Sequence, residues 1–208
     1  MTNKLNISLE DAPLNSFHKK LAIYSSGAPF LDGYILSIIG VVLMQLSQAL
    51  QLTELQEGLV AAASLIGMFF GGFVGGLFTD KLGRKTLYVL VLVMLAVFSL
   101  GQFWVTSAWA LITLRLLLGI AIGADHPLAT SLLAEFLPKK QRGSILASLV
   151  MMWFVGAAVA YVAGELILRS MGPEAWRWAL ASAVVPAVLF LIMRAGTPES
   201  ARWLVSKG

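Results

Sequence analysis

Cysteine is absent from this 208-residue sequence, and charged residues are scarce. Without cysteine there is no disulfide, no thiolate metal ligand and no cysteine nucleophile. Charged residues make up only 12% of the chain, about half the usual share of a soluble domain, whereas 58% of the residues are hydrophobic. So few charges do not cover a water-facing surface, and a mean hydropathy of +0.83 agrees with this. The main solvent of the chain must therefore be lipid.

Two further kinds of signal are missing. The first sixteen residues are polar and contain Glu10, Asp11 and Pro13, so they lack the basic stretch and short apolar core of a cleaved signal peptide. The sequence also has no metal-ligand pair, no Gly-x-Ser-x-Gly nucleophile elbow and no phosphate-binding loop. We therefore expect no enzymatic activity, no metal and no cofactor.

Six apolar stretches are present, each close to the roughly 20 residues that a helix needs to cross a bilayer. We place the membrane-spanning helices at about Leu21–Leu46, Gly58–Phe78, Thr86–Val105, Trp109–Leu132, Ile145–Leu168 and Trp176–Met193. Helices are predicted because every backbone polar group in lipid must be satisfied within its own span, and the stretches show no strand alternation. The predicted fold class is an all-α membrane protein with six transmembrane helices.

Lysine and arginine are unevenly distributed between the connections of these helices. One side of the predicted membrane carries twelve of them and the other carries only Arg169 and Arg177, while Arg115 falls inside a span. The side rich in lysine and arginine normally faces the cytoplasm. We therefore predict that both termini are cytoplasmic. This distribution also explains the net charge of +4 without a nucleic-acid partner.

A distinctive motif connects the second and third predicted helices. Residues 76–85 read Gly-Leu-Phe-Thr-Asp-Lys-Leu-Gly-Arg-Lys. Gly76 allows close approach of helices, and Gly83 allows a tight reversal of the chain. Asp80 lies at a helix end, where it can pair with Arg84 or cap the next helix. Every position matches the loop signature of the major facilitator superfamily, which the sequence therefore resembles.

Three more motifs follow in the order typical of that superfamily. Arg115, with glycines at positions 119 and 123, resembles the arginine motif of the family's fourth helix. Segments 135–143 and 198–204 resemble two signatures of the sugar porters, although Ala201 stands where the second signature has proline. The resemblance implies that cytoplasmic charges form salt bridges that close the inward side. The candidate gating residues are Gly76, Asp80, Gly83, Arg84, Glu135, Arg142, Glu199 and Arg202.

The resemblance covers the chain from about Phe17 onward and implies an architecture. Members of the superfamily have twelve spans in two six-helix halves, with substrate bound between the halves. Residues 1–16 are then a cytoplasmic segment, and residues 17–208 are the N-terminal six-helix bundle without its C-terminal counterpart. The implied location is a bacterial inner membrane. The implied partners are lipid, protons, a small-molecule substrate, and the C-terminal six-helix half or a second copy.

Asp32 and Arg115 are ionisable residues within predicted spans, where a buried charge is costly and needs a partner. Asp32 lies about eleven residues into the first span, roughly 16 Å deep, and Arg115 lies about seven residues, or roughly 10 Å, into the fourth. Because the two spans run in opposite directions across a core of about 30 Å, their depths agree within one helical turn. We therefore predict that the two side chains pair and that protonation of Asp32 releases Arg115. The alternative is a purely structural ion pair.

Asp125 and His126 are further candidates for the same cavity. At 100° per residue, His126 falls within about 20° of Arg115 around the helix axis, and Asp125 falls about 80° away. The unperturbed pKa of histidine suits proton handling. A solvated histidine near the cytoplasmic end and a structural Asp125 are the alternatives.

Two positions depart from the sugar porters. Their first span often reads Phe-Gly-Tyr-Asp, and alignment of Gly33 and Tyr34 places Ile35 where that aspartate falls. Asp32 instead resembles the first aspartate of the Asp-Gly-Phe-Asp pattern of aromatic-acid–proton symporters. The second aspartate of that pattern is also replaced by Ile35 in this sequence. Val150 stands where the fifth span of sugar porters has a sugar-contacting glutamine. The resemblance therefore favours a metabolite or organic-acid symporter over a hexose transporter.

Glycine, tryptophan and proline give predictions about packing. Small residues at spacing four predict faces where membrane helices touch. These faces are formed by Gly67, Gly71 and Gly75, and by Gly156, Ala160 and Gly164. The predicted interfacial anchors at the outer helix ends are Trp104, Trp109, Trp176 and Trp178. The predicted sites of helix kinks or breaks are Pro29, Pro127 and Pro186.

The leading hypothesis is proton-coupled symport of a small organic metabolite, such as an organic acid or a sugar-like compound. Its substrate is expected to bind near Asp32 and Arg115 and to change sides as two bundles rock. A single half has no second bundle to rock against, so we expect no transport by this chain alone unless it dimerises or meets a separate C-terminal half. The alternative is a truncated, non-transporting membrane remnant or a partner subunit.

Overall fold

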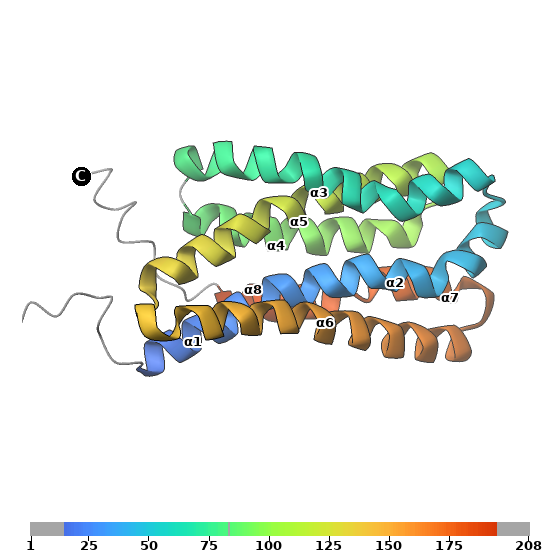
Figure 1. Cartoon of the computed structure of the whole chain (residues 1–208). Helices are drawn as coiled ribbons and strands as arrows, with labels where there is room; N and C mark the ends of the chain where they lie inside the picture. Colours follow the sequence, from blue (N-terminus) through green and yellow to red (C-terminus); the bar gives the residue numbers. More distant parts are fainter. Residues whose placement is uncertain (1–14, 83, 195–208) are drawn as a thin grey trace, which may run out of the picture.

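The computed structural model describes residues 15–82 and 84–194, and this part of the chain is helical (Figure 1). The longer helices are α1 (Ser16–Ser25), α2 (Gly27–Leu50), α3 (Glu54–Leu82), α4 (Arg84–Gly101), α5 (Ala108–Phe136), α6 (Lys139–Ser170), α7 (Ala175–Ala181) and α8 (Val184–Arg194). Two short 3-10 helices, η2 (Gln102–Trp104) and η3 (Gly172–Glu174), lie in connections on the same end of the bundle.

Five stretches of the described chain are long and apolar enough to cross a membrane. They are Lys20–Leu50, Glu54–Phe73, Ala108–Asp125, Lys140–Ser170 and Gly172–Met193. A shorter apolar stretch, Val89–Trp104, comes from α4 and η2. The six predicted spans are thus found as helices, with α1 and α2 sharing the first and α7 and α8 sharing the sixth. The fold class is confirmed, and most helices extend a few residues beyond the predicted ends.

Breaks divide the first and sixth spans, and each lies just before a proline. The first break is at Ser26, three residues before Pro29, and the second separates α7 from α8 just before Pro186. Proline has no N–H to donate to the carbonyl four residues earlier, so each proline is accommodated in the first turn of a new helix. At Pro127 the helix does not break, because α5 runs through this residue, and a kink there stays a prediction. Membrane helices tolerate an internal proline when neighbouring groups satisfy the freed backbone.

Glycine sets the closest helix contacts, which join α3 to α5. A Cβ atom on Gly67 would lie 2.1 Å from the backbone oxygen of Leu116, and one on Gly71 would lie 2.2 Å from that of Ile120. The same holds from the other side, because a Cβ on Gly119 would lie 2.0 Å from the backbone oxygen of Ser64. The two backbones therefore touch, and the predicted glycine face on α3 is confirmed.

A second close pair joins α2 to α6, which lie side by side in Figure 1. A Cβ on Gly33 would lie 2.0 Å from the Trp153 oxygen, and one on Gly156 would lie 2.0 Å from the Phe30 oxygen. The two helices differ in burial: 61% of the apolar window of α2 is buried but only 17% of that of α6. Thus α2 is central, and α6 presents most of its surface outward.

Candidate functional site

Three ionisable side chains are buried within the membrane-spanning helices. Asp32 lies on α2 and is 1% exposed, whereas Arg115 and Asp125 lie on α5 and are 1% and 0% exposed. Because charges in lipid-facing positions are costly, such residues normally point into the bundle or a cavity and mark functional sites. All three residues are buried, and their role in proton coupling or substrate binding stays a prediction.

Arg115 is held by the neighbouring helix α3. Its Nε donates a 2.7 Å hydrogen bond to the backbone oxygen of Val60, and the Ser64 hydroxyl donates one of 3.0 Å to the backbone oxygen of Arg115. These bonds are possible because Gly119, one turn away, brings the two helices together. The two terminal nitrogens, Nη1 and Nη2, have no hydrogen-bond partner in the described part of the chain. The guanidinium thus keeps donors available for a further group.

The predicted pairing of Asp32 with Arg115 is wrong. We call the end of the bundle at Leu50 and Ala108 the outer end, because the charge distribution predicts that it faces outward. Arg115 lies seven residues, or roughly 10 Å, from the start of α5 at this end, whereas Asp32 lies eighteen residues, or roughly 27 Å, from the end of α2. The difference of about 16 Å exceeds what the two side chains span.

The three guanidinium nitrogens of Arg115 also make no bond to Asp32, because Nε donates to the Val60 oxygen and Nη1 and Nη2 have no hydrogen-bond partner among the described residues. The prediction failed because it counted Asp32 from the inner end of its span against a core of about 30 Å, whereas the apolar stretch Lys20–Leu50 has 31 residues and is about 46 Å long.

Asp125 is the candidate that lies at the depth of Asp32. It is seventeen residues, or roughly 25 Å, from the outer start of α5, so the two carboxyl groups agree in depth within half a helical turn. Both are buried. His126 follows on α5, but its side chain lies outside the described residues. The predicted pair of Asp32 and Arg115 is therefore not found. Instead, Asp32 and Asp125 lie at one depth, and Arg115 lies about three helical turns further outward.

Most of the predicted cytoplasmic gating residues lie outside what the structure describes. This holds for Gly83, Glu199 and Arg202 as a whole, and for the side chains of Asp80, Arg84 and Glu135. Gly76 is exposed on α3, and a Cβ there would meet nothing within 4 Å, so its predicted close helix contact is not seen among the described residues. Arg142, in the first turn of α6, donates a 3.1 Å hydrogen bond from Nη2 to the Leu137 oxygen.

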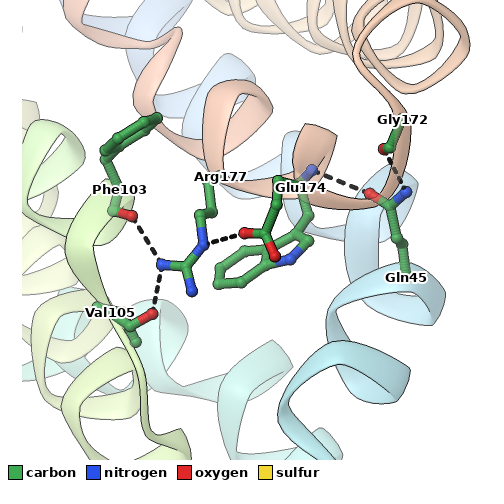
Figure 2. A network of polar contacts seen from close by, with 7 residues as sticks. Gln45, Phe103, Val105, Gly172, Glu174 and Arg177 are labelled. Carbon is green, nitrogen blue, oxygen red and sulfur yellow. Dashed lines mark hydrogen bonds and ion pairs between the residues drawn. The ribbon is translucent and has the colours of Figure 1, made fainter.

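The outer end of the bundle contains a polar network that the sequence analysis missed (Figure 2). Arg177, at the start of α7, donates from Nη1 to the backbone oxygens of Phe103, at 2.7 Å, and Val105. Its Nε pairs with Glu174. The guanidinium carbon also lies 4.3 Å from the ring centroid of Trp176. Arg177 therefore ties the sixth span to the connection between the third and fourth.

Gln45 makes a second link in the same network. Its Nε2 donates a 3.0 Å hydrogen bond to the Gly172 oxygen, and its Oε1 accepts one of 2.9 Å from the Trp176 backbone (Figure 2). Gly172 has a φ of 71°, which favours glycine. Trp176 is fully buried, so its predicted role as an interfacial anchor is wrong, whereas Trp104, Trp109 and Trp178 are exposed as predicted.

Comparisons with known proteins agree with this architecture. Residues 20–208 match the family model for "Sugar (and other) transporter". The chain is 41% identical over 179 residues to the inner membrane metabolite transport protein YgcS of Escherichia coli and 32% identical over 170 residues to the 4-hydroxybenzoate transporter PcaK of Pseudomonas putida. These matches cover 86% and 82% of this chain but only 40% and 37% of the relatives' own lengths.

The fold has a close counterpart among solved structures. The proton:xylose symporter XylE of the major facilitator superfamily superposes with a TM-score of 0.86 over 93% of this chain and 47% of its own, at 24% identity. This likeness concerns the arrangement of helices, in which the chain matches the N-terminal half. The family match over nearly the whole sequence shows that the chain belongs to the sugar (and other) transporter family of the major facilitator superfamily.

Proposed function

We propose that this chain forms the N-terminal half of a proton-coupled transporter for a small organic metabolite. The observation that carries the proposal is the burial of Asp32, Asp125 and Arg115 on the two most buried spans, α2 and α5. Membrane helices do not retain such residues for packing, which small apolar residues achieve at lower cost. Ionisable groups within membrane spans instead mark substrate pathways and proton relays.

The two carboxyl groups are the proposed proton carriers. Burial disfavours the charged form of an acid, and both carboxyl groups are buried. Protonation of Asp32 or Asp125 therefore stabilises a closed, desolvated arrangement of α2 and α5, and proton release favours the entry of water. His126, next to Asp125, is proposed to exchange protons with the cytoplasmic side.

Arg115 is the proposed anchor for the substrate. Its unoccupied Nη1 and Nη2 donors would bind a carboxylate or another strong acceptor, and a guanidinium binds carboxylate with two parallel hydrogen bonds. Relatives named for 4-hydroxybenzoate and for xylose indicate that both acids and sugar-like compounds belong to the range of the family. We therefore propose an organic acid or a hydroxylated compound as the substrate.

The proposed partner is a second six-helix unit, either a C-terminal half or another copy of this chain. The curated relatives are longer than the part that this chain matches, and alternating access requires two bundles that rock against each other. The excess of lysine and arginine on one side further supports cytoplasmic termini and gating by the loop motifs.

Transport by proteoliposomes tests this proposal. The chain is reconstituted alone and with a six-helix C-terminal half from a relative, and uptake of candidate metabolites is measured with and without an inward proton gradient. We expect gradient-driven uptake only where two bundles are present, that is, from the pair of halves or from a dimer of this chain. Asp32→Asn should abolish the gradient-driven part and retain exchange of substrate between the two sides, because asparagine keeps the size of the side chain but carries no titratable proton.

Two results would contradict the proposal. One is gradient-driven uptake by the monomeric chain alone, which would remove the need for a second bundle. The other is undiminished gradient-driven uptake by both Asp32→Asn and Asp125→Asn, which would exclude these carboxyl groups as proton carriers.

A further inference from the structure

The backbone contact between α3 and α5 includes a polar residue toward its outer end. Ser64 on α3 is fully buried, and a Cβ on Gly119 of α5 would lie 2.0 Å from the Ser64 backbone oxygen. Arg115 precedes Gly119 by four residues, so it lies one helical turn further outward on the same side of α5. The contact therefore brings Ser64 beside the backbone of the proposed substrate anchor.

An exchange of hydrogen bonds joins Ser64 to Arg115. The Ser64 hydroxyl donates to the Arg115 backbone oxygen at 3.0 Å, and the Arg115 Nε donates to the Val60 backbone oxygen at 2.7 Å. Val60 lies four residues before Ser64, and a serine hydroxyl inside a helix often bonds back to the oxygen at that distance. Because the Ser64 hydroxyl bonds across to α5 instead, the Val60 oxygen keeps one lone pair for Arg115 beside its helical bond.

The bond to Val60 decides which edge of the guanidinium is open. A guanidinium has two edges with a pair of parallel donors, one formed by Nε with an Nη and the other by Nη1 with Nη2. In Arg115 the first edge is occupied by the Val60 oxygen, whereas Nη1 and Nη2 have no hydrogen-bond partner within residues 15–82 and 84–194. While this bond persists, a carboxylate can make two parallel bonds only to Nη1 and Nη2.

A second buried serine shows that burial alone does not produce such a bond. Ser99 on α4 is 1% exposed, yet its hydroxyl oxygen has no hydrogen-bond partner in the part of the chain that the structure describes. Close helix contact needs only a small residue, so alanine at position 64 would serve packing equally well. The hydroxyl of Ser64 therefore has a role beyond packing, and that role is its bond to α5.

We infer that Ser64 is a positioning residue for Arg115, which reserves the Val60 oxygen for Nε and leaves Nη1 and Nη2 as the edge that a ligand meets. The inference rests on the proposed role of Arg115 as substrate anchor and adds the direction from which a carboxylate approaches it. If the Ser64 hydroxyl rotated back to Val60, it would compete with Nε for the same lone pair. The released Nε would then open the second edge of the guanidinium.

The side-chain NMR signals of arginine test the positioning role without any ligand. The purified chain is prepared with isotope-labelled arginine in lipid nanodiscs, and the Nε–H signal of Arg115 is assigned by its loss in Arg115→Lys. We expect Ser64→Ala to raise the solvent-exchange rate of this proton roughly fivefold, which corresponds to the loss of one typical hydrogen bond. Ser99→Ala is the matched control, because its hydroxyl has no partner among the described residues, and it should leave the rate unchanged.

The Nε–H of Arg177 is an internal reference in the same spectra. It bonds to Glu174 at the outer end, away from the contact between α3 and α5. A general loosening of the bundle would speed the exchange of both arginine protons, whereas loss of a positioning bond speeds only that of Arg115. An unchanged Arg115 rate in Ser64→Ala would overturn the inference. So would an equal rise in Ser99→Ala or at Arg177.

Titration of the unmutated chain with sodium acetate tests the direction of approach. Acetate carries one carboxylate and no other polar group, and sodium chloride at equal concentration controls for ionic strength. We expect acetate to shift the Nη signals of Arg115 and to leave its Nε signal in place. A shift of the Nε signal with faster Nε–H exchange would overturn the inference, because the ligand would then displace Val60. If acetate shifts no signal of Arg115, the proposed anchor and the approach along its Nη edge both fail, while the exchange rates still decide whether Ser64 positions the guanidinium.

Discussion

The middle of the bundle and its outer end are held together in different ways. In the middle, α3 and α5 are joined by backbone contact at glycines, with few side-chain bonds between them. At the outer end, Arg177 and Gln45 connect three segments of the chain. Their hydrogen bonds to backbone oxygens and to a backbone nitrogen join residues 72 to 131 positions apart (Figure 2). The first region depends on the absence of side chains and the second on two particular side chains.

The difference follows from the surroundings of each region. Within lipid, helices gain little from burying apolar surface against each other, so close van der Waals contact between backbones provides the attraction. At the outer end the helices stop, and their connections expose carbonyl groups that need donors. A guanidinium with five donors satisfies several of them at once. Mutations should therefore act through shape in the middle and through hydrogen bonds at the outer end.

The largest effect is expected from Gly119→Ala. Its new Cβ would lie 2.0 Å from the Ser64 backbone oxygen, which is not a group that can rotate away. The helices must separate, at a cost of roughly 3 kcal/mol, the upper part of the usual range for overpacking. Far-UV circular dichroism during denaturant unfolding in mixed micelles measures this cost.

Gly72→Ala is the matched control for that variant. Gly72 is exposed on α3, and a Cβ there would meet nothing within 4 Å. Since alanine favours a helix over glycine by about 1 kcal/mol, this variant should be neutral or slightly more stable. Equal destabilisation by both substitutions would show that backbone contact does not hold the middle together.

A smaller effect is expected from Arg177→Ala at the outer end. The variant leaves the Phe103 and Val105 oxygens without their donor and removes the contact with the Trp176 ring. Loss of hydrogen bonds from a charged donor in a partly buried site should cost about 2 kcal/mol. Arg169→Ala is the control, because that arginine makes an exposed ion pair whose loss should cost less than about 0.5 kcal/mol. If the two variants lower the unfolding midpoint equally, the outer network does not stabilise the fold.

This contrast also explains what the sequence could predict. The six spans and the glycine face of α3 are local patterns: a run of about 20 apolar residues, and Gly67, Gly71 and Gly75 at spacing four. The breaks before Pro29 and Pro186 are likewise local. The sequence analysis uses Arg177 only in the count of positive charges on each side of the membrane and does not predict its contacts. Its acceptors are the backbone oxygens of Phe103 and Val105, and every residue carries such an oxygen. No pattern of residue types predicts a hydrogen bond from a side chain to a backbone oxygen far away in the sequence.

The candidate site was predicted in its residues but not in its geometry. Asp32, Arg115 and Asp125 stood out because ionisable groups are rare in apolar stretches, and all three are buried. Their relative depth depends on where each helix ends. The expected depth of Asp32 is counted from the inner end against a core of about 30 Å, whereas the apolar stretch Lys20–Leu50 has 31 residues and is about 46 Å long. Counted from Leu50, Asp32 lies at the level of Asp125 and not of Arg115. Helix ends are the least certain part of a structure predicted from sequence. A side-chain depth that is counted from a predicted helix end carries the same error.

The smallest effect is expected from a polar contact within the middle region itself. Tyr34 on α2 and Ser182, at the break between α7 and α8, form a 2.6 Å hydrogen bond through their hydroxyl groups. Hydrogen bonds between membrane helices average only about 0.6 kcal/mol in double-mutant cycles. The Ser182 hydroxyl also donates to the Ala179 oxygen at 2.6 Å, so it keeps a partner when the tyrosine is changed.

A cycle of Tyr34→Phe, Ser182→Ala and the double variant isolates this bond, with unfolding measured as above. We expect a coupling energy of about 0.6 kcal/mol. The Ser182 hydroxyl keeps the Ala179 oxygen as a partner, and Tyr34→Phe removes only the hydroxyl group and keeps the ring. A coupling above the roughly 1.7 kcal/mol reached by the strongest measured pairs would mean that a side-chain bond fixes the broken sixth helix against α2. The middle of the bundle would then depend on particular side chains as the outer end does, and the contrast between the two regions would be one of degree.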